Sequence, residues 1–238
     1  MLFRSDNRIS SMSTKLMQLI CLIIFLVGIY IASKGLNPLK KLATLAGTSM
    51  FIMSILFIIL MVAAPSITNA HLYKINWSFK TFMPTFDLKY FTGLAILVFA
   101  VGGCEKISPY VNKMKEPETG FSKGMIALSI MVAVCAILGT ISLGMMFDSN
   151  NVPKDLMTNG SYYAFQKLGG YYKLGNLFVI IYAIINMINQ FAVLIISIDA
   201  PLRMLLDSAD ERFIPKKMFE KNKYGSYKNG NILILVIV

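Results

Sequence analysis

Long apolar runs alternate with short polar segments along the whole sequence. They lie at about 16–32, 42–64, 88–111, 124–147, 174–198 and 231–238. A helix that spans a bilayer needs roughly 20 predominantly apolar residues. The pattern therefore predicts five spanning helices and the beginning of a sixth, because the last run is only about two helical turns long. A single transmembrane domain, 1–238, accounts for the pattern, and the short last run indicates a fragment of something longer.

The composition points to the same class. Of the 238 residues, 56% are hydrophobic and only 15% are charged, and the mean hydropathy is +0.63. These values predict an all-α, polytopic helical membrane protein. The net charge of +11 does not indicate nucleic acid as a partner. The basic residues gather between the apolar runs, as in cytoplasmic loops that face the anionic lipids of a bilayer.

The third apolar run contains residues that do not fit a simple spanning helix. Gly102 and Gly103 weaken the helix, and Pro109 lacks the N–H that a regular helix requires. Glu105 and Lys106 are ionisable, and such groups inside a bilayer usually face a cavity or a solute pathway. The sequence therefore predicts a broken helix near 98–111 that lines a solute site.

A stripe of polar residues lies in the fifth run. Asn186, Asn189 and Gln190 are spaced so that they share one helix face, and Tyr182 lies one turn before them. These side chains are expected either to line a polar site or to hydrogen-bond a neighbouring helix, and the spacing supports both interpretations equally.

Enzymatic chemistry is not indicated. The single histidine, His71, lies in a loop, and no cluster of carboxylates occurs in any apolar run. The three cysteines lie in apolar runs without metal-ligand spacing, so we expect neither a metal nor another cofactor. A non-transporting membrane scaffold or subunit remains the alternative to a transporter, and a membrane enzyme is the less favoured class.

Two groups of residues resemble amino acid permeases of the amino acid/polyamine/organocation superfamily, in particular the glutamate/4-aminobutyrate antiporter-like branch. The first group resembles the region of the sixth helix: Val98–Glu105, Val111–Lys113, Pro117, Phe121 and Lys123–Gly124. The second resembles the loop after the eighth helix: Pro201–Arg203, Asp207, Asp210, Arg212–Lys216 and Asn222. Lys34–Gly35 is similar to the turn after the fourth helix.

The resemblance implies a multi-pass protein of the cell membrane that covers about the fourth to ninth helices of the family. The implied fold is an inverted five-helix repeat of the LeuT type, with a midplane site for amino acids or related amines and a proton as a further partner. It gives no oligomeric state. The substrate would meet an unwound turn and the residue that follows it, namely Phe99, Ala100, Val101, Gly102, Gly103 and Cys104.

The resemblance also implies a role for Glu105, which matches an acid tied to proton sensing and gating. The alternative is a fixed ion pair, although Lys106, its sequence neighbour, would not face it on a regular helix. Lys106 stands where relatives usually carry a small residue, so it could change substrate preference or reach the membrane surface. The first helix of the family has no counterpart in this sequence, and the chain alone is not expected to transport.

Overall fold

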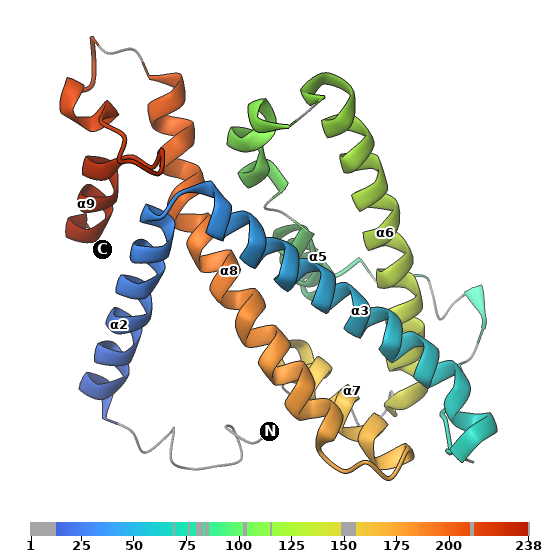
Figure 1. Ribbon diagram of the computed structural model, residues 1–238. Helices are drawn as coiled ribbons and strands as arrows, with labels where there is room; N and C mark the ends of the chain where they lie inside the picture. The colour runs from blue at the N-terminus through green and yellow to red at the C-terminus, as the bar shows by residue number, and fades with distance from the viewer. Residues whose placement is uncertain are drawn as a thin grey trace.

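The described residues fold into helices, which confirms the predicted all-α class (Figure 1). The computed structural model describes residues 13–237 except 69, 76, 80–82, 84–85, 102–103, 115, 149–155 and 210–211. The α-helices are α2 (Thr14–Ser33), α3 (Leu36–Thr68), α5 (Leu88–Val101), α6 (Pro117–Met146), α7 (Leu156–Tyr171), α8 (Leu177–Ser208) and α9 (Lys228–Ile237). Two segments are 3-10 helices, η1 (Cys104–Lys113) and η2 (Lys216–Phe219).

Four of these helices, α2, α3, α6 and α8, are long and apolar enough to cross a membrane. Many of their large apolar side chains are exposed, among them Ile52 and Val62 on α3 and Ile126 and Ile137 on α6. Apolar surface of this extent suits a hydrocarbon solvent rather than water. The polytopic character predicted from the sequence is therefore confirmed.

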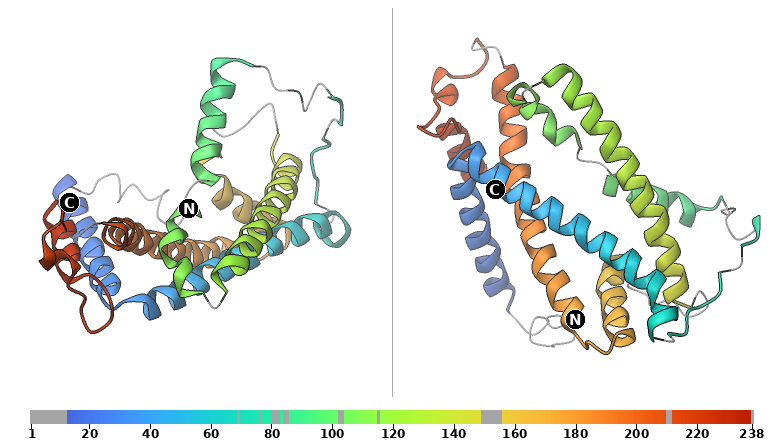
Figure 2. Two further views of the ribbon diagram at one scale, coloured as in Figure 1. Left: turned by 90° about the horizontal axis from the view of Figure 1, so that it is seen from above. Right: turned by 45° about the vertical axis from the view of Figure 1, so that its right-hand side comes forward.

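α8 is the central element of the described fold. It contacts α2, α3, α7, η1 and α9, and α3 crosses it at an angle, as Figure 1 shows. Seen from above, α5 stands out to one side of the long helices (Figure 2).

The largest buried cluster lies where α3, α7 and α8 meet the end of α6. Its fully buried members include Met61, Met146 and Leu168. A second cluster joins α2 and the start of α3 to α8 through Ala32 and Ile195. α8 therefore has packing partners along most of its length.

Local sequence explains where several helices begin. The Ser13 hydroxyl accepts a hydrogen bond from the Leu16 amide, and Asp87 Oδ1 accepts one from the Tyr90 amide at 2.8 Å. Such side chains satisfy amides that have no partner within the first turn. α6 begins with Pro117, whose missing N–H costs nothing at this position.

Three helix boundaries correct the sequence-based expectations. The apolar run at 42–64 was expected to give the bounds of its helix, but α3 continues through Pro65 to Thr68, where the Thr68 hydroxyl donates to the Ala64 carbonyl at 2.7 Å. The resemblance placed the residues from Pro201 in a loop, but α8 continues through Pro201 to Ser208. The start of α6 at Pro117 lies inside the polar loop expected at 112–123. For α8, the buried contacts of Asp199, Arg203 and Leu206 accompany the continuation past Pro201, whereas at the start of α6 the proline is itself compatible with the first turn.

The segment between the apolar runs at 124–147 and 174–198 contains a further helix, α7, which packs against the protein along one face. Ala164, Phe165 and Leu168 are buried against the α3 and α8 side of the molecule. One face of α7 is therefore part of the main buried cluster.

The turn between α2 and α3 is held by a segment that is distant in the sequence. Gly35 has a φ of +83°, and a Cβ at this position would collide with the carbonyl oxygen of Tyr224. Asn222 Nδ2 donates to the Ser33 carbonyl at 2.6 Å, so the end of α2 receives its partner from the α8–α9 connection.

Candidate functional site

The helix type changes at the predicted break. α5 ends at Val101, and the chain resumes at Cys104 as the 3-10 helix η1, which contains Pro109. The intervening Gly102 and Gly103 lie outside the described residues. An unbroken α-helix through 98–111 is therefore excluded, as the glycine doublet and the proline predicted.

The unwound turn was expected to begin at Phe99, and this detail is wrong. Phe99, Ala100 and Val101 form the last turn of α5. The apolar run continues to Val101, and glycine first weakens the helix after it. The side chains of Phe99, Ala100, Val101, Cys104 and Glu105 lie outside the described part, so the roles assigned to them stay predictions.

Two side chains of η1 reach α8. Lys106 Nζ donates to Ser197 Oγ at 3.1 Å, and the Tyr110 hydroxyl donates to Asp199 Oδ2 at 2.6 Å. Both contacts are partly buried. They fix the face of η1 that carries Lys106 and Tyr110 against the second half of α8.

A buried ion pair stands behind the Tyr110 contact. Arg203 Nε lies 2.6 Å from Asp199 Oδ2, one helical turn away, and both side chains are at most 4% exposed. The Arg203 guanidinium also lies 5.8 Å from the centroid of the Tyr110 ring. Its Nη2 is buried without a hydrogen-bond partner among the described residues. Charges desolvated in this way are stable only while they remain paired.

The three amides of the predicted stripe, Asn186, Asn189 and Gln190, lie in different environments. Asn186 Nδ2 donates to the Tyr162 hydroxyl of α7 at 3.0 Å, so Asn186 serves as an interhelix hydrogen-bond donor. Asn189 is partly buried and Gln190 is exposed. Neither of them makes a side-chain hydrogen bond to the described part of the chain, so the three amides do not converge on one point.

Tyr182 belongs to the aromatic contact between α7 and α8. Its ring stacks on Phe165 with centroids 4.7 Å apart, and it meets Tyr162 edge-on at 5.1 Å. Ser197, the partner of Lys106, lies eleven residues after Asn186, roughly 16 Å along the axis of α8. The structure therefore does not bring Tyr182 or Asn186 together with Lys106.

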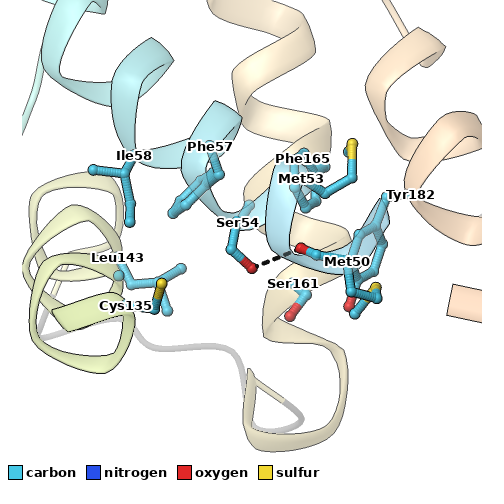
Figure 3. Close-up of a pocket in the computed structure, with 12 residues that line it drawn as sticks. Met50, Met53, Ser54, Phe57, Ile58, Cys135, Leu143, Ser161, Phe165 and Tyr182 are labelled. Carbon is cyan, nitrogen blue, oxygen red and sulfur yellow. Dashed lines mark hydrogen bonds between the residues drawn. The ribbon is translucent and has the colours of Figure 1, made fainter. Parts of the chain in front are cut away.

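A cavity of about 210 Å³ opens beside Tyr182, between α3, α6, α7 and α8 (Figure 3). Its polar groups include Ser54, whose hydroxyl donates to the Met50 carbonyl at 3.0 Å. The lining carries no charged side chain: Met50, Met53, Ser54, Phe57, Ile58, Cys135, Gly139, Leu143, Ser161, Ala164, Phe165 and Tyr182. A zwitterion would lose hydration here without gaining a counter-charge, so this cavity is a poor amino acid site.

Four residues at the η1–α8 contact were not predicted as site residues from the sequence: Tyr110, Ser197, Asp199 and Arg203. A signal was available for two of them, because Asp199 and Arg203 are spaced four apart at the end of an apolar run. Pro201 between them favoured a loop and hid that signal. No three His, Cys, Asp or Glu residues of the described ranges are arranged to hold a metal ion.

Comparison with known proteins gives consistent matches. A family model described as amino acid permease matches residues 6–238. The aspartate/glutamate permease AcaP of Lactococcus lactis subsp. cremoris (strain MG1363) is 48% identical over 236 residues, which cover 98% of this chain and 48% of that protein. The inner membrane transporter YjeM of Escherichia coli (strain K12) is 25% identical over 138 residues, which cover 55% of this chain and 26% of that protein.

The chain thus spans about half the length of the lactococcal protein, and its matched part covers about a quarter of YjeM. No solved structure matches it.

Proposed function

Because this chain belongs to the amino acid permease family, we propose that it works in a secondary transporter that moves amino acids or related amines across the cell membrane. It is a multi-pass membrane protein with apolar helices of spanning length. The resemblance read from its sequence motifs is confirmed by the family match. The transport activity, the substrate and the location of the site are the proposal.

The observation that carries the proposal is the end of α5 at Val101. Fourteen α-helical residues rise roughly 21 Å, less than the hydrocarbon thickness of about 30 Å. If α5 crosses the membrane from Leu88, it is too short to reach the far side, and its end at Val101 would lie within the bilayer. The last carbonyls of a helix lack intrahelical partners and carry its negative partial charge, which suits the ammonium group of an amino acid.

The substrate-binding segment of this proposal is the backbone from Phe99 to Cys104. Glu105 follows it at once and is assigned to gating, by a change in its protonation or pairing as the transporter switches sides. Burial disfavours a charged carboxylate, so a proton is the natural partner for such a step. We keep the LeuT-type arrangement of helices as part of this proposal.

The substrate class follows from the lactococcal relative, whose name assigns it aspartate and glutamate. At 48% identity over nearly the whole chain, acidic amino acids are the first substrates to test.

The test is uptake of labelled aspartate, glutamate and neutral amino acids by cells that express the protein from its natural gene. We expect saturable uptake that is absent from cells without the gene. Replacing Glu105 by Gln is expected to flatten the dependence of uptake on external pH. Unchanged pH dependence in that variant would refute the role of Glu105, and absence of saturable uptake of any amino acid would refute transport.

A further inference from the structure

We propose that Lys106 is the specificity-determining residue for acidic substrates, whose side-chain carboxylate its ammonium group binds. The inference rests on the proposed function, and it names the side chain that distinguishes acidic from neutral amino acids. Lys106 lies in the first turn of η1, directly after the proposed gating acid.

Among the side chains that the structure describes, none neutralises the charge of Lys106. Its partner is the Ser197 hydroxyl at 3.1 Å, which is polar but uncharged. Within the described part of the chain, no carboxylate lies within 4.0 Å of its Nζ. The ammonium group has three hydrogens to donate, and Ser197 takes one of them. A partly buried cation in this condition attracts an anion.

Asp199, the nearby acid of α8, already has hydrogen-bond partners. Asp199 accepts hydrogen bonds from Tyr110 and Arg203, both at 2.6 Å, and its pairing with Arg203 balances its charge. It therefore does not compete for Lys106. Among the described side chains of the η1–α8 contact, the unbalanced positive charge therefore lies at Lys106.

The position of Lys106 suits a second anchor for the substrate. At about 2 Å per residue in a 3-10 helix, it lies roughly 4 Å beyond Cys104, where η1 begins. The carbonyl end of α5 comes just before and is suited to the substrate's ammonium group. Two anchors of opposite sign, close together in the chain, match a substrate that carries an extra carboxylate.

The contact with Ser197 also argues against the alternative in which Lys106 reaches the membrane surface. A snorkelling lysine extends its ammonium group into water or among lipid headgroups. Here the ammonium group turns towards α8 and is partly buried at the helix contact.

The experiment compares aspartate with asparagine, which has nearly the same size but no side-chain charge. Both uptake rates are measured against concentration in cells expressing the protein from its natural gene. For Lys106→Gln we expect the KM for aspartate to rise roughly ten- to hundred-fold, since a hydrogen bond to a charged group is worth about 1.5–3 kcal/mol. The KM for asparagine is expected to change less than three-fold, and Lys106→Arg is expected to keep the preference for aspartate.

Two controls separate recognition from structure. Ser197→Ala removes the hydroxyl partner and keeps the cation, so the ratio of the two KM values is expected to stay. Lys221→Gln makes the same chemical change at an exposed lysine near Asp207 and is also expected to leave the ratio unchanged. The inference would be overturned if Lys106→Gln left the ratio of the two KM values unchanged, or if Lys106→Arg changed that ratio as much as Lys106→Gln does.

Lys106→His provides a test that does not depend on comparing different protein preparations. Protonated histidine restores the charge below about pH 6.5, so the aspartate-to-asparagine preference is expected to rise between pH 7.5 and 5.5. A flat preference overturns the inference. If the unmodified protein transports no amino acid, the proposed function itself is refuted. If it transports amino acids but the Lys106 variants keep the same preference for aspartate over asparagine, only the role of Lys106 is refuted.

Discussion

The two ends of α8 are joined to the molecule by different chemistry. Near its beginning, Tyr182 stacks on Phe165 at 4.7 Å, and Phe165 meets Phe57 of α3 at 5.5 Å. Near its end, hydroxyl, carboxylate and guanidinium groups bind η1 and one another, with Arg203 and Asp199 both buried. The first contact depends on shape and apolar area, whereas the contact of η1 with α8 depends also on a few polar and charged groups.

This difference indicates which of the two contacts, α7 with α8 or η1 with α8, separates more easily. Parting α7 from α8 would expose a continuous apolar cluster at a cost that grows with its area. Parting η1 from α8 breaks two hydrogen bonds, those of Lys106 and Tyr110, which water can replace, and uncovers the part of the smaller apolar cluster against which Tyr110 packs. Asp199 and Arg203 both lie on α8, so their ion pair is kept in such a movement. We therefore expect η1 to detach more readily than α7.

Arg203→Ala should give the largest loss of stability. It leaves Asp199 buried without its cation, which costs about 3–5 kcal/mol in the free energy of unfolding. Denaturant unfolding in detergent measures the loss. Changing both members, Asp199→Leu with Arg203→Met, should recover most of it, because a well-packed apolar pair avoids desolvation. A double variant as unstable as Arg203→Ala would contradict this account.

The exposed pair Lys221–Asp207 serves as the control for that experiment. Its charged atoms are 3.4 Å apart, and the side chains are 47% and 45% exposed. Removing it should cost less than about 1 kcal/mol.

Leu168→Ala tests the apolar joint. Leu168 is fully buried among the residues that join α3, α7 and α8. Truncation should cost about 2–5 kcal/mol through lost transfer energy and the cavity left behind. The same unfolding assay measures it. Leu168→Met nearly conserves volume and should cost less than about 1.5 kcal/mol; an equal loss in both variants would argue against tight packing here.

Matched tyrosine variants compare the two joints with one chemical change. Tyr110→Phe removes a hydrogen bond to the Asp199 carboxylate and should cost about 1.5–3 kcal/mol. Tyr162→Phe removes a neutral bond from Asn186 and should cost about 0.6 kcal/mol, the average for such bonds between membrane helices. If the two variants lose equal stability, the distinction between the charged and the apolar end of α8 is wrong.

The smallest effect concerns pH and the segment after α8. Burial and the bond to Asp207 raise the pKa of Tyr227, and the bond to Tyr227, followed by Asp207, raises the pKa of Lys221. Groups that hold protons more tightly when folded stabilise the fold below their unfolded pKa, about 10, and lose that contribution as pH rises through the folded pKa.

Docking of residues 216–231 is therefore expected to weaken above about pH 10 and to be steady between pH 6 and 9. Limited proteolysis of this segment across that range measures the change. Tyr227→Phe should reduce the alkaline step, and loosening on the acid side would contradict the assignment.

The sequence predicted the helical class and the position of the break. Both follow from strong local signals, namely runs of spanning length and a glycine doublet followed by a proline. It did not predict that α8 continues through Pro201, because the partners of Asp199 and Arg203 include Tyr110, which is distant in the chain.

For a related reason, the sequence did not predict which face of α7 is buried. Ala164, Phe165 and Leu168 are no more apolar than many surface residues of a membrane helix. Only their contacts with α3 and α8 identify them as buried. The spacing of Asn186, Asn189 and Gln190 likewise could not tell a binding stripe from an interhelix bond, since that depends on where Tyr162 lies.

The hydrogen bond from Asn222 to the Ser33 carbonyl sets an order of events during synthesis. The two residues are 189 positions apart. At about 5–20 residues per second, a ribosome needs roughly ten to forty seconds to supply the missing partner. Until then the nascent end of α2 must rely on water or lipid headgroups, so the turn at Gly35 reaches its finished form only after the α8–α9 connection has been synthesised.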